Sequence, residues 1–275
     1  MITVAAALAA ARRLGLARLD AQVLLGHLLR RPRGWLIAHD GVALTAVEAQ
    51  AFEALAARRA AGEPLAYLVG EREFHGLRLA VDRNTLVPRP ETELLVDWAI
   101  ECLLHDQAPS GHAARVLDLG TGSGAIALAV KHACPFAAVT AVDVSEGALA
   151  VARRNGAALR LDIEWLHSDW WFALGERRFD LLLGNPPYVA EGDPHLEALA
   201  HEPALALTAG LRGLDALNHL ITGAPRHLSP GGRLLLEHGH EQGEAVRRML
   251  AEGGFGAIET RLDLAGLPRC TGGRR

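Results

Sequence analysis

The tetrapeptide Asn185-Pro186-Pro187-Tyr188 brings a side-chain amide, two prolines and an aromatic ring together directly after the apolar run 179–184. That run is typical of a buried strand in a parallel sheet, and the prolines end it because neither can donate to the strand ladder. The Asn185 amide offers one acceptor oxygen and one NH2 group. Such a stiff loop suits holding a planar, NH2-bearing group in a fixed orientation. An ordinary proline turn is the alternative for the four residues taken alone.

A second chemical motif is the glycine-rich turn 118–124, which lies between an apolar run and an alanine-rich helical stretch. Glycines let the backbone approach a ligand that a Cβ would block. About twenty residues further on, a second run ends in Asp143, a spacing that suits a carboxylate accepting hydrogen bonds from ribose hydroxyls. Turn and carboxylate together indicate a nucleoside cofactor without saying which one. Because Gly120, Gly122 and Ala125 also fit the dinucleotide fingerprint, a nicotinamide-dependent oxidoreductase stays open.

The elements that must position these motifs are strands that alternate with helical stretches from Arg115 onward. This alternation predicts the α/β class, with a doubly wound, Rossmann-like parallel sheet. Ligands bind such sheets beyond the carboxyl ends of the strands, where both motifs are expected. We place strands near 115–119, 138–143, 162–166, 179–184 and 232–237, followed by an antiparallel pair after Gly256.

Composition divides the chain into three parts. Residues 1–73 predict a small N-terminal helical bundle, in which Thr45 and Glu48 form a capping box for a helix through Arg59. Alternation within 74–88 predicts a β-hairpin linker, and 89–275 form the α/β domain, which begins with a helix over 92–104. Taken alone, the bundle is interpreted as a purely stabilising element.

Taken together, the motifs resemble those of S-adenosylmethionine-dependent methyltransferases that act on amide or exocyclic amino nitrogens. More narrowly, the chain resembles the protein-(glutamine-N5) methyltransferase family of peptide chain release factors over nearly its whole length. Besides the two motifs and Asp143, the resemblance is carried by Leu86-Val87-Pro88-Arg89-Pro90-Glu91-Thr92-Glu93, Ser168-Asp169-Trp170, Glu237-His238-Gly239 with Gln242, and Asp263 with Arg269.

The resemblance implies a class I methyltransferase fold and S-adenosylmethionine as cofactor. It also implies that the substrate is the glutamine of the Gly-Gly-Gln motif in class-1 release factors, and that the helical bundle helps to grip this protein. The residues implied in cofactor binding are Asp118, Gly120, Thr121, Gly122, Ser123, Gly124, Asp143, Asp169, Trp170 and Asn185.

Individual roles follow from the same resemblance. Asp143 is expected to hold the ribose, Asp169 to accept from the adenine amino group, and Trp170 to cover the ring. Asp118 either organises the glycine turn or meets the cofactor amino group. Glu91 and Thr92 either cap the following helix or belong to the site, and these alternatives stay open.

A glutamine amide is a poor nucleophile because its nitrogen lone pair is delocalised into the carbonyl. The task of the enzyme is therefore orientation and exclusion of water, and good positioning can remove about 7–11 kcal/mol of barrier. We expect the Asn185 side-chain oxygen and the Pro186 carbonyl to accept the two amide hydrogens. Tyr188 then packs against the amide plane, and Pro187 completes the predicted catalytic loop. No general base is required, because methylation makes the nitrogen strongly acidic.

Charge bears on the choice of partner. Residues 1–85 carry 11 basic and 8 acidic side chains, whereas 86–275 carry 17 and 24. Nucleic-acid binders usually present a basic surface, so the acidic α/β part argues against a nucleic-acid adenine amino-methyltransferase, the main alternative. A protein that binds the cofactor without turnover is a further alternative. We expect release factors as partners, no direct nucleic acid and a monomer.

The remaining features concern compartment and metals. The three cysteines, Cys102, Cys134 and Cys270, have no paired or metal-like spacing, which is typical of reduced thiols in a cytoplasmic protein. No run reaches the ~18 apolar residues that a membrane span needs. His238 and His240 would share one face of a strand, but no third ligand stands at a recognisable spacing. We therefore predict neither a membrane segment nor a metal site.

Overall fold

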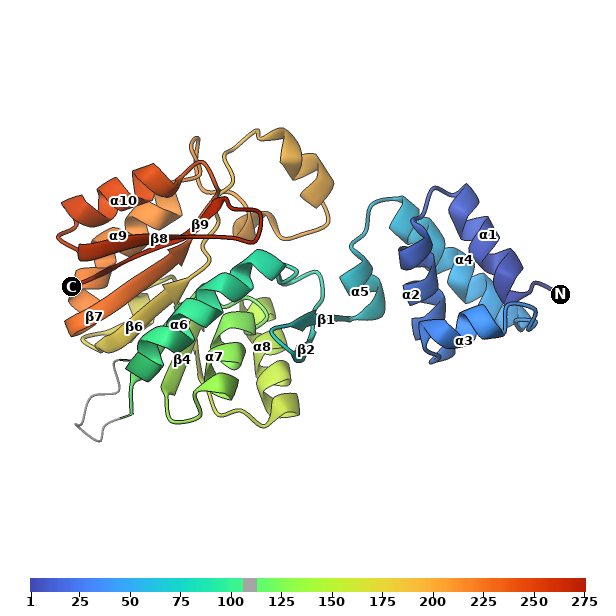
Figure 1. The fold of residues 1–275 in the computed structure, drawn as a ribbon, viewed down its shortest axis with the longest axis horizontal. Coiled ribbons are helices and arrows are strands. Elements are labelled where there is room, and N and C mark those ends of the chain that lie inside the picture. The colour runs from blue at the N-terminus through green and yellow to red at the C-terminus, as the bar shows by residue number, and fades with distance from the viewer. Residues whose placement is uncertain (106–112) are drawn as a thin grey trace. The chain divides into compact units, whose positions relative to one another are not determined.

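The computed structural model describes residues 1–105 and 113–275. These residues form two compact units, Met1–Glu71 and Arg72–Arg275, each with its own core. Figure 1 shows helices at the N-terminal end of the chain and a strand-rich region after them. Within the described ranges, no helix is long and apolar enough to cross a membrane.

The second unit is organised around one seven-stranded sheet with the order β5-β4-β3-β6-β7-β9-β8. Neighbouring strands from β5 to β7 are parallel, whereas β9 is antiparallel to both β7 and β8. The strands are β3 Arg115–Leu119, β4 Ala138–Asp143, β5 Glu164–His167, β6 Phe179–Gly184, β7 Leu228–Glu237, β8 Gly256–Leu262 and β9 Pro268–Arg274. The predicted fold class is confirmed.

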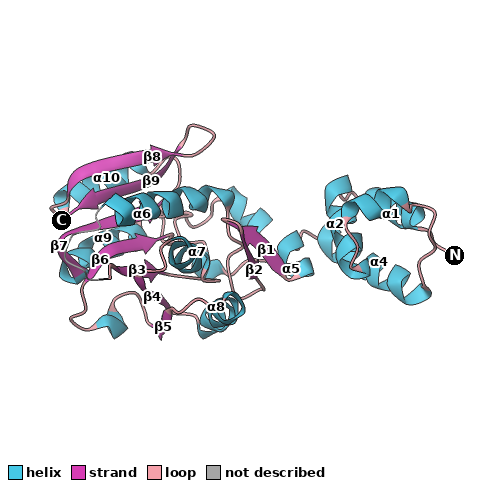
Figure 2. Cartoon of the chain, turned by 60° about the horizontal axis from the view of Figure 1, so that its bottom comes forward, coloured by secondary structure: helices cyan, strands magenta, loops and turns pink. Residues whose placement is uncertain are grey.

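Helices cover both faces of this sheet, and in Figure 2 the magenta strands run between the two groups. Alternating strand residues feed two cores: Val116 and Leu183 pack with one group, whereas Leu117 and Leu182 pack with the other. The first group is α6 Glu93–His105, α7 Ala125–Ala133 and α8 Glu146–Leu159, and the second is α9 Asp215–His227 and α10 Gly243–Glu252. Four 3₁₀ turns complete the described part of this unit: η1 Pro90–Thr92, η2 Phe172–Leu174, η3 Pro194–Leu199 and η4 Ala204–Ala206.

A β-hairpin precedes the sheet and consists of β1 Glu71–Phe74 and β2 Leu77–Ala80. Its Leu79 side chain is fully buried in the core of the second unit. Asn155 on α8 anchors the hairpin, because its Oδ1 accepts from the Ala80 N–H at 2.7 Å and its Nδ2 donates to the Ala80 carbonyl at 3.0 Å. The hairpin therefore packs as part of the α/β unit, and the division of the chain at residues 73 and 88 stays a prediction.

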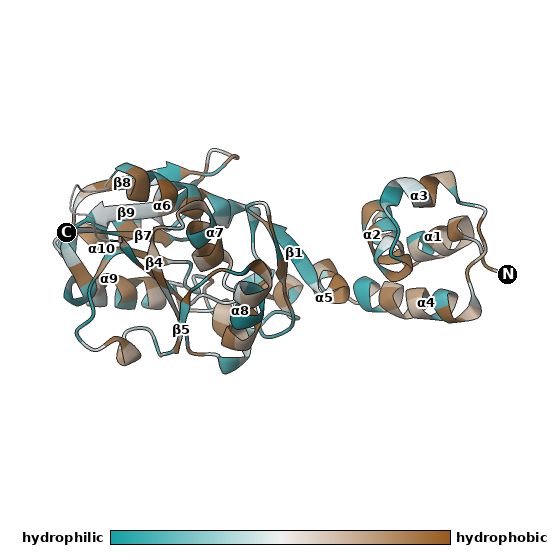
Figure 3. Ribbon diagram, turned by 90° about the horizontal axis from the view of Figure 1, so that it is seen from below, coloured by the Kyte–Doolittle hydropathy of each residue, from teal (hydrophilic) through white to brown (hydrophobic). Residues whose placement is uncertain are grey.

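The first unit is a bundle of α1 Val4–Arg13, α2 Arg18–Leu29, α3 Arg33–Ala38, α4 Ala46–Ala60 and α5 Leu65–Val69. Figure 3 shows both brown and teal residues along α2 and α4, and Leu24, Leu25 and Phe52 from these helices are buried in the core of this unit. The predicted capping box at the start of α4 is confirmed. The Glu48 N–H donates to Thr45 Oγ1 at 3.2 Å, and the Thr45 N–H donates to the Glu48 carboxylate at 2.8 Å.

The predicted strands match the observed ones closely, with differences at three ends. The third strand covers Glu164–His167 rather than 162–166, and β7 begins at Leu228 rather than 232. The early part of β7 escaped prediction because Pro230, Gly231 and Gly232 interrupt the apolar pattern and look like a turn. The pairing of β6 with β7 has a register shift in this part.

Candidate active site

The carboxyl ends of β3, β4 and β6 border a cavity of about 520 Å³, which is within the range of sites for small molecules and cofactors. The glycine turn, Asp143, Asn185 and Pro187 line it together. Further walls come from 84–92 and from 203–219, two segments far apart in the sequence. The parallel sheet thus brings the two chemical motifs to one cavity.

The glycine turn has a backbone that only glycine adopts freely. Gly120, Gly122 and Gly124 have φ values of 73°, 57° and 84°. A Cβ at Gly120 would lie 3.3 Å from a ring carbon of Trp170. Ser123 is buried, and its carbonyl accepts from Asn155 Nδ2 at 2.9 Å, which fixes the turn to α8. The turn therefore presents backbone to the cavity in a shape that side chains would obstruct.

Asp118 lies fully buried beneath this turn. Its Oδ2 accepts from Thr121 Oγ1 at 2.6 Å and from the Ala127 N–H at 3.2 Å, whereas Oδ1 has no hydrogen-bond partner among the described residues. Burial raises the pKa of Asp118 to about 7, the two hydrogen bonds oppose that rise, and nearby Asp143 adds to it. Of the two roles considered for Asp118, these contacts favour organising the turn.

Asp143 ends β4 and connects the turn to the next strand. Its Oδ2 accepts from the Gly122 N–H and its Oδ1 from the Ser145 N–H, both at 2.8 Å. Burial raises the pKa of Asp143, although these backbone donors stabilise the charged form. Each carboxylate oxygen retains a further lone pair, so the group can still accept from ribose hydroxyls.

Asp169 and Trp170 follow β5 and line the cavity beside the glycine turn. Their position is fixed by Ser168, whose N–H donates to the Asp143 carbonyl at 3.0 Å and whose hydroxyl donates to the Trp170 carbonyl at 2.9 Å. Trp170 has a φ of 46°, which is uncommon for a bulky residue. This backbone sets the Trp170 ring against Gly120.

The neighbouring tryptophan has a different environment. The Trp171 ring stacks on His227, with ring centroids 5.0 Å apart, and its Nε1 would lie 2.2 Å from a Cβ placed at Gly223 in α9. Trp171 thus packs between the sheet and α9. Sequence analysis assigned Trp170 to the site, and Trp170 is the one of the two that lines the cavity.

Asn185 lies at the carboxyl end of β6, facing the 84–92 segment. Its Nδ2 donates to Thr92 Oγ1 at 3.2 Å, and Thr92 is only 4% exposed. This contact directs the amide nitrogen toward Thr92 and leaves the amide oxygen for a donor in the cavity. Pro187 also lines the cavity, while Pro186 is buried.

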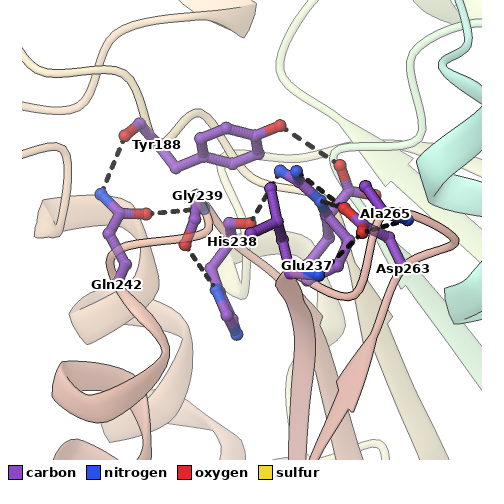
Figure 4. A network of polar contacts seen from close by, with 9 residues as sticks. Tyr188, Glu237, His238, Gly239, Gln242, Asp263 and Ala265 are labelled. Carbon is purple, nitrogen blue, oxygen red and sulfur yellow. Dashed lines mark hydrogen bonds and ion pairs between the residues drawn. The ribbon is translucent and has the colours of Figure 1, made fainter.

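Tyr188 is held at both ends, as Figure 4 shows. Its hydroxyl donates to Glu237 Oε1 at 3.3 Å, and its carbonyl accepts from Gln242 Nε2 at 3.0 Å. The same Gln242 accepts from the Gly239 N–H at 2.9 Å through its Oε1. Burial raises the pKa of Tyr188, and Glu237 adds to the rise, so the phenol stays protonated.

Glu237 ends β7 directly behind this loop and is 1% exposed. Burial raises the pKa of Glu237 to about 7, while the Thr92 hydroxyl, Arg269 and Tyr188 favour the charged form. Its Oε2 has no hydrogen-bond partner among the described residues. Sequence analysis named Glu237 only within the motif Glu237-His238-Gly239 and gave it no separate role, because a glutamate at a strand end has no distinguishing spacing.

Glu202 was also missed, since it lies in an irregular segment without a motif. Its side chain is 3% exposed, accepts from the Val87 N–H at 3.0 Å and forms an ion pair with Arg89 at 2.5 Å. The ion pair connects the 84–92 segment to the loop that follows Tyr188. Because both segments line the cavity, Glu202 fixes the distance between two of its walls.

The two histidines considered as metal ligands point to different surroundings. His238 is buried, with Nε2 2.7 Å from Thr271 Oγ1 and Nδ1 2.8 Å from the Gly239 carbonyl oxygen. Burial lowers the pKa of His238, which favours the neutral ring. His240 pairs instead with Glu241 at the surface. The contacts of His238 assign it to the packing of β7 against β9.

The cavity fits a nucleoside cofactor that carries an amino-acid arm. Three glycines with positive φ leave the backbone accessible, and Asp143 has lone pairs for ribose hydroxyls. Asp169 and Trp170 line the same cavity beside the glycine turn. The strand order, the antiparallel β9 and this site define a class I methyltransferase that uses S-adenosylmethionine.

Comparison with known proteins refines this class. The family model described as "Methyltransferase small domain" matches residues 93–260, and that described as "PrmC N-terminal domain" matches residues 2–70. The chain is 48% identical over 262 residues to the release factor glutamine methyltransferase of Bordetella pertussis, covering 94% of this chain and 95% of the relative. It is 47% identical over 260 residues to that of Xylella fastidiosa strain Temecula1, covering 94% and 93%. The chain belongs to the release factor glutamine methyltransferase family.

Among solved structures, a methyltransferase from Pyrococcus furiosus aligns with a TM-score of 0.54 and 20% identity, covering 72% of this chain and 89% of that one. This similarity concerns the fold alone. Family membership makes the chain a protein-glutamine N-methyltransferase with S-adenosylmethionine as cofactor. The nicotinamide-dependent oxidoreductase considered from the glycine turn is therefore wrong.

Proposed function

We propose that this enzyme methylates the side-chain amide nitrogen of the glutamine in the Gly-Gly-Gln motif of class-1 peptide chain release factors. The curated relatives are named for glutamine methylation of release factors, and the chain spans more than nine-tenths of their length. The Gly-Gly-Gln motif itself comes from the family resemblance of the sequence. The proposal therefore specifies which glutamine is the acceptor.

The orientation of Asn185 is the observation that carries the proposal. With Nδ2 bonded to Thr92, its Oδ1 is available to accept a hydrogen from a primary amide in the cavity. We place the Pro186 carbonyl as the second acceptor. Two fixed acceptors orient both N–H bonds of a glutamine amide and so aim its nitrogen lone pair.

Bound S-adenosylmethionine supplies an electrophilic methyl group. The chain contributes the geometry: Asp143 and the glycine turn hold the cofactor, and Asp169 and Trp170 border the end assigned to adenine. Tyr188, anchored by Glu237 and Gln242, packs against the substrate amide and excludes water. After transfer the nitrogen carries a positive charge, and its proton leaves to solvent.

We also propose that the helical bundle, residues 1–73, docks the protein substrate. The bundle has its own core and its own family model, and it contains more basic than acidic side chains. Docking predicts a much lower KM for an intact release factor than for a short peptide that contains Gly-Gly-Gln. Equal KM values would contradict it. The cytoplasmic location and the monomeric state stay predictions from the sequence.

The function is tested by transfer from radiolabelled S-adenosylmethionine with purified enzyme and three acceptors. These are an unmodified release factor, the same factor with alanine in place of the Gly-Gly-Gln glutamine, and DNA in duplex and single-stranded form. The proposal predicts label in the unmodified factor only. Label in the alanine variant would refute the acceptor residue, and label in DNA without label in the factor would move the activity to nucleic-acid amino groups.

A further inference from the structure

The side chain of Asn185 serves its role in only one of its two amide orientations. Rotating the amide by 180° would exchange Oδ1 and Nδ2 and present a donor, instead of an acceptor, to the substrate NH2 group. The orientation is fixed by Thr92, whose Oγ1 accepts from Nδ2 at 3.2 Å. A hydroxyl can also donate, however, so Thr92 selects the orientation only if its own hydrogen is directed to another acceptor.

Glu237 is suited to be that acceptor. The carboxylate is 1% exposed, and its Oε1 already accepts from the Tyr188 hydroxyl, whereas Oε2 is unpartnered within the described ranges. Thr92 and Glu237 both contact the 185–188 loop, Thr92 through Asn185 and Glu237 through Tyr188. The Thr92 hydroxyl also favours the charged form of Glu237 and so lowers its pKa. Hydrogen bonds of a catalytic site often tighten when the site closes on its substrate.

Other groups around the carboxylate do not compete for this position. Arg269, on the neighbouring β9, directs Nε and Nη2 to Asp263 at 3.2 and 3.1 Å and Nη1 to the His238 carbonyl oxygen at 3.4 Å. Figure 4 shows Asp263 and His238, two of the residues that Arg269 contacts, near the hydrogen bond between Tyr188 and Glu237. Arg269 thus favours the charge on Glu237 from a distance and leaves Oε2 to a hydroxyl donor.

Building on the proposed function, we propose that Glu237 and Thr92 are positioning residues for methyl transfer. Glu237 Oε2 takes the Thr92 hydroxyl hydrogen, Thr92 Oγ1 can then only accept from Asn185 Nδ2, and Asn185 Oδ1 faces the substrate amide. The other carboxylate oxygen holds the Tyr188 hydroxyl. The buried Glu237 carboxylate thereby orients both Asn185 and Tyr188, the two side chains that contact the glutamine.

The three residues come from η1, the loop after β6, and the end of β7. A role in fold stability alone does not explain the arrangement of Thr92 and Glu237. A helix cap at Thr92 would not require a carboxylate behind it. A buried carboxylate with a hydrogen bond to only one of its two oxygens lowers stability unless the second oxygen also gains a donor.

The test uses the full-length enzyme with a release factor and compares Thr92→Val with Thr92→Ser. Valine preserves the shape without the hydroxyl, whereas serine retains the hydroxyl without the methyl group. We expect Thr92→Val to lower kcat about tenfold or more, because one orienting hydrogen bond is lost. The dissociation constant for S-adenosylmethionine should stay within about twofold of wild type, and Thr92→Ser should recover most of the lost kcat. Thr222→Val, at an exposed position on α9, is the matched control.

A second variant, Glu237→Gln, tests the origin of the effect. It presents only one carbonyl oxygen to two hydroxyl donors, so kcat should fall about fivefold or more. Because the two residues act in series, Thr92→Val combined with Glu237→Gln should lose little more than the more damaging single variant. If Thr92→Val fails to fold, the kcat of Glu237→Gln alone tests the inference.

Several outcomes would overturn the inference. Unchanged kcat in Glu237→Gln would do so, as would equal losses in Thr92→Val and Thr92→Ser, which would indicate a purely structural role. A loss of cofactor affinity that parallels the loss of kcat would have the same consequence. If wild-type enzyme transfers no methyl group to the release factor, the proposed function falls and takes the inference with it. Normal wild-type transfer with unaffected variants would refute the inference alone.

Discussion

The two sides of the cavity are built on different principles. The glycine cradle, residues 118–124 with Asp143, is formed by neighbouring segments and presents mainly backbone. The transfer edge, residues 185–188 with Thr92 and Glu237, is formed by side chains that are distant in sequence. Asn185 is hydrogen-bonded to Thr92, 93 residues away, and Tyr188 to Glu237, 49 residues away. The cradle therefore needs glycines, because a Cβ would obstruct the cofactor. The transfer edge instead needs each hydrogen-bond donor to be oriented toward its acceptor.

This difference separates two kinds of failure. Damage to the cradle should affect cofactor binding, because the backbone surface itself is the binding element. Damage to the transfer edge should affect turnover, because its side chains orient the acceptor nitrogen in the reaction. Kinetic and binding measurements on the same variants can distinguish the two.

The largest effect on cofactor binding is expected for Gly120→Val in the cradle. A β-branched residue at a φ of 73° is strained, and its Cβ would meet the Trp170 ring at 3.3 Å. We expect the dissociation constant for S-adenosylmethionine to rise about 100-fold, equivalent to about 2.7 kcal/mol. Isothermal titration calorimetry measures it directly.

The control for this variant is Gly266→Val. Gly266 has a similar φ of 76° but open space around its Cβ position, outside the cavity. It should lose about 1–2 kcal/mol of stability from backbone strain alone and keep its cofactor affinity. Equal losses of affinity in both variants would show that strain, rather than the shape of the cradle, is responsible.

A smaller effect is expected for Gln242→Ala at the transfer edge. Gln242 donates to the Tyr188 carbonyl at 3.0 Å and accepts from the Gly239 N–H at 2.9 Å, so its loss loosens the catalytic loop. We expect kcat to fall about fivefold to tenfold with cofactor affinity unchanged. Glu244→Ala, on the exposed side of α10, serves as control. A matching fall in cofactor affinity would contradict the separation of edge from cradle.

A third effect, on stability rather than on catalysis, is a pH dependence that both sides share. Burial raises the pKa of Asp118 and of Glu237 to about 7 from ordinary values of 3.8 and 4.5. Between those limits the folded protein keeps protons that the unfolded chain has released, so these groups lower the free energy of unfolding as pH rises toward 7. Each contributes a slope of at most about 1.4 kcal/mol per pH unit.

This slope is measured by urea unfolding between pH 5 and pH 8. Asp118→Asn and Glu237→Gln should each flatten it, since an amide does not titrate in this range, whereas exposed Glu244→Gln should not. A wild-type slope retained in both site variants would mean that other groups govern the pH dependence.

Much of the cradle could be predicted from sequence because its signals are local. Glycine spacing and a strand ending in Asp143 describe one continuous βαβ unit, and the strand pattern was enough to predict the sheet. Where Pro230 and two glycines broke that pattern, the start of β7 was missed. Local sequence patterns therefore predict the presence of a strand or helix better than the residues at which it begins and ends.

The transfer edge was predicted only in part, for a physical reason. Asn185 and Tyr188 stand in a motif, but Glu237 and Glu202 acquire meaning only through burial and through partners that are distant in sequence. The role of Thr92 was left open because a helix cap and a site residue have the same local sequence. Its hydrogen bond with Asn185 becomes visible only once the sheet has brought η1 beside β6.

The central claim is that Asn185 orients the substrate amide and contributes little to holding the cofactor. It is tested most directly by measuring kcat on a release factor and the dissociation constant for S-adenosylmethionine in wild type and Asn185→Ala. The account predicts that most turnover is lost, about 100-fold or more, while cofactor affinity changes only a few-fold. Turnover within about threefold of wild type, well below the effect expected for lost positioning, would contradict it.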